Sequence, residues 1–190
     1  GSNNPDGVSI KEHKDKDGNP IDGLPFFPYF VIHDLVPIVV FLFAFCAVLF
    51  FMPEMGGFFL EYANFEIANS LKTPEHIAPV WYFTPYYSML RAVPDKLGGF
   101  IIMGAAIAIL FVLPWLDRSP VRSMRYKGNI SRAALLIFAA VFIILGYLGV
   151  KAPTEGRTIL AQICTVLYFS YFIGIYFWTK YETTRPEPAR

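Results

Sequence analysis

The chain of 190 residues is 55% hydrophobic and 17% aromatic, and only 16% of its residues are charged. A soluble domain of this size carries about 25% charged residues, so the composition argues against an ordinary soluble protein. The formal net charge of +1 gives no electrostatic reason to expect a nucleic-acid partner.

Four long uncharged stretches divide the chain. They cover residues 35–52, 97–116, 133–150 and 158–179 and are 18, 20, 18 and 22 residues long. About 20 apolar residues cross a hydrocarbon core of roughly 30 Å, and a helix there satisfies its own backbone groups. A buried helix in a soluble core explains one such stretch but hardly four. We therefore predict an all-α integral membrane bundle of four transmembrane helices over residues 35–179.

The first 34 residues precede the first predicted span. Residues 6–23 are charged and glycine-rich, which is typical of a mobile loop, whereas residues 24–32 are aromatic and are expected to lie along the membrane interface. His33 and Asp34 follow at the mouth of the first helix. In one interpretation Asp34 caps this helix and interacts with its dipole. In the other, the imidazole and the carboxylate donate protons beside a pocket.

The segment between the first two spans, residues 53–96, is far longer than an ordinary helix connection of under about eight residues. Thr73 and Thr84 are each followed by proline, a pattern typical of a hydroxyl N-cap before a helix. The loop is therefore predicted to carry two short surface helices. Its aromatic residues, at 81–83 and 86–87, fit either an aromatic belt at the interface or an apolar pocket.

Glu75 and His76 lie at the start of the first of these short helices. One interpretation is that Glu75 interacts favourably with the dipole of that helix. The alternative is that this pair accepts protons beside an aromatic pocket. The residue pattern leaves both interpretations open.

Lysine and arginine are unevenly divided between the two predicted sides. Residues 1–34, 117–132 and 180–190 hold eleven of them, whereas residues 53–96 and 151–157 hold five. Positive charge is retained on the cytoplasmic side. Both ends, including the 180–190 tail, are therefore predicted to be cytoplasmic, with the 53–96 loop on the outer side.

No ionisable residue lies inside the four predicted spans, which disfavours a complete transporter. Cys46 and Cys164 lie inside spans and fit small apolar residues. The three histidines all lie outside the spans. We therefore predict that this chain holds no metal, and it cannot ligate a haem within the membrane by itself.

Five motifs in the chain together resemble one family. They are GSNNP at 1–5, PFFPYFVIHD at 25–34, TPEHIAPVWYF at 73–83, LRAVPDKLGG at 90–99 and RSMRY at 122–126. In this order and spacing they resemble the C-terminal half of cytochrome b of respiratory cytochrome bc complexes, in its bacterial form. The resemblance extends over essentially the whole chain. Subunit IV of the photosynthetic counterpart is similar but has three spans, so the respiratory type fits better.

The resemblance implies a role in electron transport and proton translocation. Cytochrome b oxidises ubiquinol at an outer site and reduces ubiquinone at an inner site, within a quinol–cytochrome c oxidoreductase. One electron passes to a Rieske iron–sulfur protein and the other crosses two b-type haems, which histidines of the N-terminal half ligate. We therefore expect this chain to be half of a longer protein and inactive alone.

The implied partners are the N-terminal half, the Rieske protein, a cytochrome c1-type subunit and membrane lipids, in a homodimeric complex. The implied location is the bacterial inner membrane, which the chain crosses several times. Neither the quinone species nor the cytochrome c acceptor follows from the sequence.

The outer site implied by the resemblance uses the family's Pro-Glu-Trp-Tyr motif, which here begins with Pro79 and Val80 and continues with Trp81 and Tyr82. Phe83 and Tyr87 match aromatic residues of the same pocket. The family's glutamate, thought to accept a quinol proton, is replaced by Val80, and valine cannot accept a proton. Glu75 is our hypothesis for the replacement.

The inner site implied by the resemblance uses Ser2, Phe26 and Asp34, which match quinone-contacting positions of the family. Asp34 is expected to deliver protons to the reduced quinone. His33 stands where relatives commonly carry lysine, and it can also donate a proton. The alternative function is a noncatalytic membrane scaffold that docks partner subunits through the 53–96 loop.

Overall fold

The computed structural model describes residues 5–7, 15–17, 24–55, 60, 62–72 and 77–187. Within these ranges the regular elements are helices, and no strand occurs among them. Four helices are long and apolar enough to cross a membrane. They are α1 (Val31–Phe51), α3 (Lys96–Leu116), α4 (Asn129–Val150) and α5 (Glu155–Tyr181). The prediction of an all-α chain with four such helices is confirmed.

The helices begin and end at positions that hydropathy alone does not mark. α1 begins four residues before the apolar stretch at 35, and α5 begins three residues before the stretch at 158. Polar caps set two of these starts: the side chains of Asp95 and Thr154 accept hydrogen bonds from the N–H groups of Gly98 and Arg157, at 2.6 and 3.4 Å. Hydropathy therefore locates the apolar part of each helix, whereas polar N-cap residues define the starts of α3 and α5 but not those of α1 and α4.

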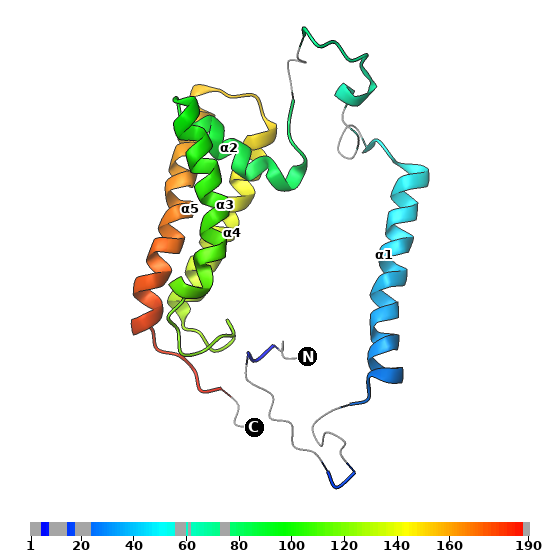
Figure 1. Ribbon diagram of the computed structural model, residues 1–190, viewed down its shortest axis with the longest axis vertical. Coiled ribbons are helices and arrows are strands. Elements are labelled where there is room, and N and C mark those ends of the chain that lie inside the picture. The colour runs from blue at the N-terminus through cyan, green and yellow to red at the C-terminus, as the bar shows by residue number, and fades with distance from the viewer. Residues whose placement is uncertain are drawn as a thin grey trace. The chain divides into compact units, whose positions relative to one another are not determined.

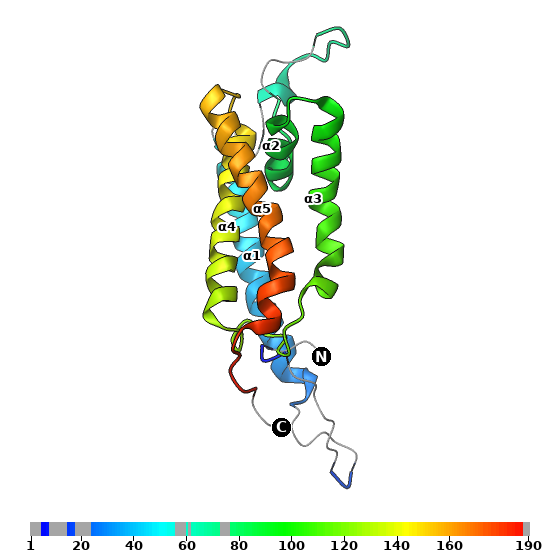
Figure 2. The ribbon, with the colours of Figure 1, turned by 90° about the vertical axis from the view of Figure 1, so that its left-hand side faces the viewer.

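The chain forms two compact units, residues 10–77 and residues 1–9 with 78–190. The second unit contains α3, α4, α5 and a short helix, α2 (Thr84–Ala92). Figures 1 and 2 show α3, α4 and α5 running lengthwise, with α2 at one end of this group. α2 packs against all three of them.

The core of this unit lies between α4 and α5 and continues to α2 and α3. Leu145, Tyr168 and Met89 have no exposed surface, and Phe172 is 1% exposed. The hydroxyl of Tyr168 donates to the carbonyl of Ala106 at 2.9 Å, which satisfies a polar group that would otherwise be buried unpaired. This bond ties the middle of α5 to the middle of α3.

An aromatic cluster fills the α4–α5 interface. The ring of Phe138 on α4 stacks on Tyr171 with centroids 4.4 Å apart, and it lies 5.3 and 5.4 Å from the rings of Tyr168 and Phe172. Each such aromatic pair adds about 0.5–1.5 kcal/mol beyond the area that it buries. Ring packing therefore holds the middle of the α4–α5 interface together.

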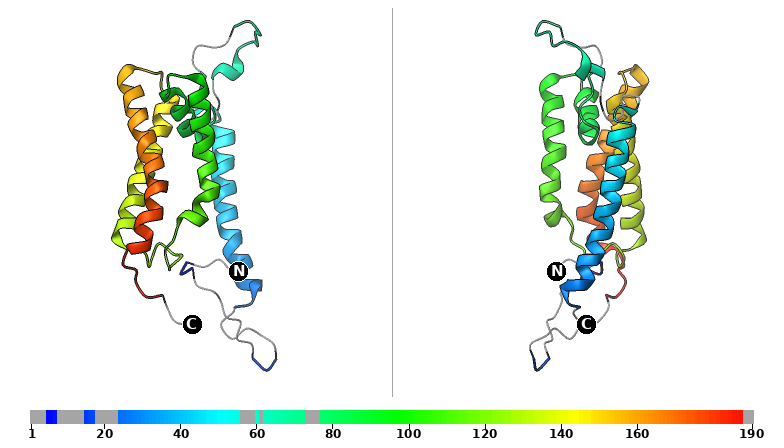
Figure 3. Two further views of the ribbon diagram at one scale, coloured as in Figure 1. Left: turned by 60° about the vertical axis from the view of Figure 1, so that its left-hand side comes forward. Right: turned by 90° about the vertical axis from the view of Figure 1, so that its right-hand side faces the viewer.

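Polar contacts close the end of this unit that lies opposite α2, where Figure 3 shows the 117–128 connector and the red segment after α5. Lys127 is only 6% exposed, and its charge is paired with the carboxylate of Asp117. The N–H of Arg185 donates to the carbonyl of Tyr126 at 2.7 Å. Residues 5–7 join this end through the hydroxyl of Tyr126, which donates to the carboxylate of Asp6 at 2.7 Å.

The other unit contains α1, preceded by a wide helical turn, η1 (Phe26–Phe30), and followed by a short 3-10 turn, η3 (Tyr62–Phe65). No residue of α1 is buried. Its apolar side chains include Phe43 at 77% and Phe50 at 73% exposure. Within its own unit α1 therefore presents hydrocarbon on every face, which suits a helix that is covered by lipid or by other chains.

Glu182 caps α4 from the far end of α5. Its carboxylate accepts hydrogen bonds from the hydroxyl of Ser131 and, at 2.8 Å, from the N–H of Ser131. Burial acts to raise the pKa of Glu182, but these bonds and those from the N–H groups of Ile130 and Gly128 outweigh it and lower the pKa. The negative charge also lies at the positive end of the α4 dipole.

We expect Glu182→Gln to lower the free energy of unfolding at pH 7 by about 1–2 kcal/mol, because the hydrogen bonds of a charged carboxylate at the start of α4 are lost. The folded pKa is lowered, so the contribution of the carboxylate is complete above the unfolded pKa of about 4.3 and disappears as the pH falls through the folded pKa. Melting curves of the detergent-solubilised protein between neutral and acidic pH should therefore converge for the two proteins. Glu187→Gln in the same tail is the control, and a stability difference independent of pH contradicts this account.

Candidate functional site

The segment that carries Pro79 and Val80 turns directly into α2. Val80 is extended, with φ −52° and ψ 145°, and the N–H of Phe83 donates to its carbonyl at 2.8 Å. Trp81–Phe83 form a 3-10 turn, η4, and α2 follows at Thr84. The aromatic motif is therefore fixed at the start of a helix.

The prediction that Thr84 is the N-cap of this short helix is wrong in detail. The N-cap is Phe83, without a side-chain cap, and Thr84 lies one position inside the helix. Its hydroxyl donates to the carbonyl of Trp81 at 2.6 Å, and the residue is 2% exposed. The side chain thus closes the η4 turn as a donor, because burial against the bundle turns it away from the free N–H groups of the helix.

The rings of the motif form a continuous exposed surface. Tyr82 and Phe83 lie 4.9 Å apart between ring centroids at an interplanar angle of 47°, and Trp81 meets Tyr82 edge-on at 5.5 Å. Tyr82 is 52% exposed, Phe83 48% and Trp81 77%. This chain therefore supplies an open aromatic wall, defined by Trp81–Phe83, rather than an enclosed pocket.

The remaining aromatic residues of α2 have different surroundings. Tyr86 is half-buried and meets Phe142 of α4 edge-on at 5.9 Å. Tyr87, predicted to share a pocket with Tyr82 and Phe83, is half-buried with the guanidinium of Arg91 4.6 Å above its ring. α2 thus turns some of its rings toward the bundle, whereas the η4 turn exposes its own.

Glu75 and His76, and the start of the first predicted short helix at Thr73, lie outside the described residues, as does Ser2. Residues 77–80, which follow that predicted helix, are not helical. The proton-accepting role of Glu75 and the quinone contact of Ser2 therefore stay predictions.

The residues of the predicted inner site lie in the unit that contains α1. His33 and Asp34 are in the first turn of α1, and both are exposed. Phe26 lies in η1, with its ring stacked on Phe30 at 6.1 Å and 67% exposed. All three side chains are thus accessible near one end of α1.

Asp34 is not the cap of α1. The N-cap is Phe30, which makes no side-chain cap, and Asp34 is the fourth helical residue. A favourable interaction with the helix dipole remains, because the carboxylate is in the first turn. The capping interpretation is wrong, so Asp34 is not committed to a backbone N–H as an N-cap would be.

His33 is the one histidine among the described residues, and no group of three or more potential ligands lies together within those ranges. The part of the chain that the structure describes thus offers no paired imidazoles for a haem iron.

Three residues that hold α2 in place were not singled out by the sequence. Arg91 and Gln162 donate hydrogen bonds to backbone carbonyls across helix boundaries, and Gly149 allows α4 to approach Thr84 closely. Arg91 had one visible signal: it is a basic residue in the last turn of the predicted second short helix. The pairing partners are 57 to 70 residues away, so their contact could not be read from local pattern.

The family model described as "Cytochrome b(C-terminal)/b6/petD" matches residues 67–169 of the chain. The chain belongs to the cytochrome b family. A cytochrome b of Allochromatium vinosum is 54% identical over the whole chain and 48% of its own length, and one of Rhodospirillum rubrum is 44% identical over 92% of the chain and 40% of its own length. The chain thus spans about half the length of these relatives, as a C-terminal half of cytochrome b.

A solved structure titled "Hyperthermophilic respiratory Complex III" matches the fold of this cytochrome b segment with a TM-score of 0.80. The sequences are 35% identical, and the match covers 93% of this chain and 42% of the other. The resemblance inferred from the five motifs is therefore confirmed at the level of family and fold.

The close approach of α4 to α2 generates a stability prediction. A methyl group on Gly149 would overlap the carbonyl oxygen of Thr84, so Gly149→Ala should force α2 away from α4 and destabilise the protein by about 1–3 kcal/mol. Gly156→Ala is the matched control, because a Cβ at Gly156 in the first turn of α5 meets no atom within 4 Å. Thermal melting of the solubilised protein measures both, and equal melting temperatures would refute the tight contact.

Proposed function

We propose that this cytochrome b segment forms walls of two quinone sites in a quinol–cytochrome c oxidoreductase. The observation that carries the proposal is the open aromatic wall, Trp81–Phe83, at the position of the family's outer-site motif. A planar quinol ring and its apolar tail suit such a surface, because aromatic rings pack face to face or edge to face and exclude water. Pro79 and Val80 add apolar surface beside it, and half-buried Tyr87, the family's other pocket aromatic, lies in the first half of α2 that follows.

The outer site oxidises quinol, which loses two electrons and two protons. Val80 is 53% exposed and cannot accept either proton. We assign proton acceptance to Glu75, five residues earlier in the same loop, because a carboxylate is the group that Val80 replaces. The scaffold of α2 keeps the rings in place while the proton leaves through the loop.

The inner site reduces quinone, which takes up two protons. Asp34 and His33 are adjacent and exposed in the first turn of α1, with Phe26 in the preceding turn. The carboxylate delivers a proton, the imidazole donates another near neutral pH, and Phe26 packs on the ring. Ser2 contributes a polar contact to the same quinone.

The two b-type haems supply the electron path between the sites. The N-terminal half of cytochrome b is assigned both of them, as the family resemblance implies. The Rieske protein, a cytochrome c1-type subunit and a second copy of the complex complete the assembly. The chain lies in a bacterial inner membrane, with both ends cytoplasmic and the 53–96 loop on the outer side.

The scaffold alternative has its own observation: Ile67 and Leu71 in the loop are 97% and 95% exposed, as expected of residues that another subunit covers. A pair of variants, one at each proposed quinone site, separates the two functions. Only the redox proposal expects each variant to impair a different half-reaction.

In the assembled membrane complex, Asp34→Asn should slow reoxidation of b haem by quinone about 100-fold, because a proton donor is lost. Tyr82→Ala should instead raise the KM for quinol in b-haem reduction roughly tenfold, because a ring contact is lost. Each half-reaction is followed by haem absorbance, with the other site blocked by an inhibitor. The proposal fails if both variants keep wild-type rates in both half-reactions while the complex assembles.

Glu75→Gln should slow quinol oxidation and remove one ionisation from its pH–rate profile, because an amide cannot accept a proton. Glu66→Gln is the matched control, since Glu66 is an exposed carboxylate in the same loop. Steady-state cytochrome c reduction between about pH 4 and 9 measures both, across the usual range of carboxylate and histidine pKa values. Unchanged turnover and pH profile for Glu75→Gln would discard its role.

A further inference from the structure

The aromatic wall, Trp81–Phe83, directly precedes α2, a helix too short to be stable without contacts to its neighbours. α2 has nine residues, and isolated helices shorter than about 12 residues are marginal in water. One face of α2, comprising Thr84, Pro85, Ser88, Met89 and Ala92, is buried against the bundle. The location of the preceding rings is therefore set by whatever fastens α2 to its neighbours.

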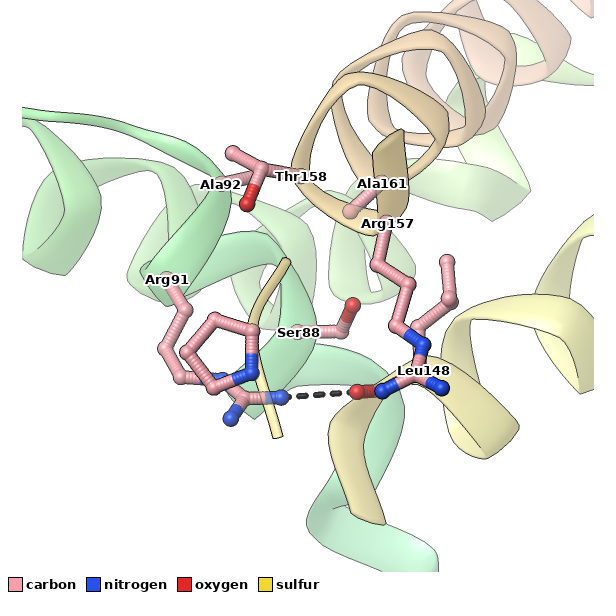
Figure 4. Close-up of a pocket in the computed structure, with 8 residues that line it drawn as sticks. Ser88, Arg91, Ala92, Leu148, Arg157, Thr158 and Ala161 are labelled. Atoms are coloured by element: carbon pink, nitrogen blue, oxygen red, sulfur yellow. Dashed lines mark hydrogen bonds between the residues drawn. The ribbon is translucent and has the colours of Figure 1, made fainter. Parts of the chain in front are cut away.

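Arg91 fastens the end of α2 to the end of α4. Its Nη2 donates to the carbonyl oxygens of Leu148 at 2.7 Å, Lys151 at 3.1 Å and Gly149 at 3.2 Å. Figure 4 shows the guanidinium pointing from α2 toward the Leu148 carbonyl. The last carbonyls of a helix lack partners within it and carry negative partial charge. The guanidinium satisfies these carbonyls and places a positive charge at the favourable end of α4.

The guanidinium of Arg91 also makes one aromatic contact and borders a small cavity. Its carbon lies 4.6 Å from the centre of the Tyr87 ring, a distance typical of a cation–π contact. Its Nε is buried without a hydrogen-bond partner among the described residues, and Arg91 lines a cavity of about 20 Å³ together with Ser88, Arg157 and Thr158 (Figure 4). A polar cavity of that volume fits one water molecule.

A second helix holds the same end of α2. Nε2 of Gln162 on α5 donates to the carbonyl of Ala92 at 2.8 Å. Ala92 is the last residue of α2, so this bond satisfies a carbonyl that the helix leaves free. α4 and α5 thus bind the carboxyl end of α2 through one long polar side chain each.

The first residue of α2 connects the position of this helix to the position of the rings. Thr84 lies against Gly149 of α4 and donates its hydroxyl to Trp81, immediately before Tyr82 and Phe83. A tilt of α2 after loss of its carboxyl-end contacts would therefore shift these rings.

We propose that Arg91 is a positioning residue of the outer quinol site, which it serves by fixing α2, and with it the aromatic wall, to the end of α4. This inference rests on the proposed function of that wall. Arg91 acts through Tyr82 and Phe83 and is not itself assigned a contact with quinol. All three hydrogen bonds come from Nη2, and the guanidinium also lies over the Tyr87 ring. Lysine offers a compact point charge without the planar guanidinium, so it replaces Arg91 only in part.

The test uses the assembled complex with Arg91→Gln, Arg91→Lys and the control Arg157→Gln. Arg157 lines the same cavity but donates to Ala152 within the α4–α5 turn, so its loss removes a guanidinium without releasing α2. Arg91→Gln should raise the KM for quinol about 10- to 100-fold, because small misplacements of binding groups cost that much. Arg91→Lys should give an intermediate KM, and Arg157→Gln the wild-type value. Quinone reduction at the inner site should be unchanged in all three.

Tyr82→Ala in the same assay separates failure of this inference from failure of the proposed function. A raised KM in Tyr82→Ala with a wild-type KM in Arg91→Gln overturns the positioning role and leaves the outer site standing. Wild-type KM values in both variants remove the outer site itself. An equal defect at both sites in Arg91→Gln shows a general structural role and also overturns the inference.

If the complex with Arg91→Gln does not assemble, Gln162→Ala tests whether fixing α2 sets the KM for quinol. It removes only the bond to Ala92, and it should raise the KM for quinol by a smaller factor than Arg91→Gln, about threefold, with the inner site unaffected. An unchanged KM in Gln162→Ala would then overturn the proposal.

Discussion

The carboxyl ends of α2 and α4 and the amino end of α4 find hydrogen-bond partners in side chains from other helices or from the segment after α5, and this requirement organises the unit that contains them. A helix leaves its first N–H and last C=O groups unpaired, and an apolar environment offers them no water. Arg91 from α2 satisfies the last carbonyls of α4, Gln162 from α5 that of α2, and Glu182 after α5 the first N–H groups of α4. These three side chains join the ends of α2, α4 and α5, and the contacts of Arg91 and Gln162 hold α2 and the Trp81–Phe83 motif that precedes it.

The apolar spans could be predicted because the pattern that indicates each one lies entirely within its own residues. A run of uncharged residues long enough for a bilayer needs no partner to be recognised, and α3 and α4 begin within four residues of the predicted stretches. The second short helix was also found, from Thr84 and Pro85. The role of Thr84 was not, because donor or acceptor behaviour depends on the burial that α4 imposes. Arg91 was visible only as a positive charge, since its acceptors lie 57 to 60 residues away.

In the candidate sites, too, local sequence predicted some features, whereas others depend on tertiary packing. Local motifs predicted that Tyr82 and Phe83 precede a helix, and the structure places their rings in contact. Tyr87 and Arg91 are four residues apart on α2, so their contact follows from helix spacing, whereas the hydrogen bonds of Arg91 to the end of α4 depend on how α2 packs against α4. On α1, residue pattern left open whether Asp34 caps the helix, and the helix start at Val31 decides against it because Val31, Ile32 and His33 precede Asp34 within the first turn. Motif recognition thus located the residues, and tertiary packing assigned their contacts.

The seat of α2 has a consequence for the order of biosynthesis. Synthesis proceeds from the amino terminus, so the aromatic turn and α2 leave the ribosome well before the α4 end and Gln162, to which α2 binds. α3 and α4 offer α2 its first contacts, but the bond from Gln162 to the carbonyl of Ala92 forms only once α5 has been made. A helix translated about 70 residues later thus completes the attachment of α2. A premature stop within α5 would damage a motif that had already been translated correctly.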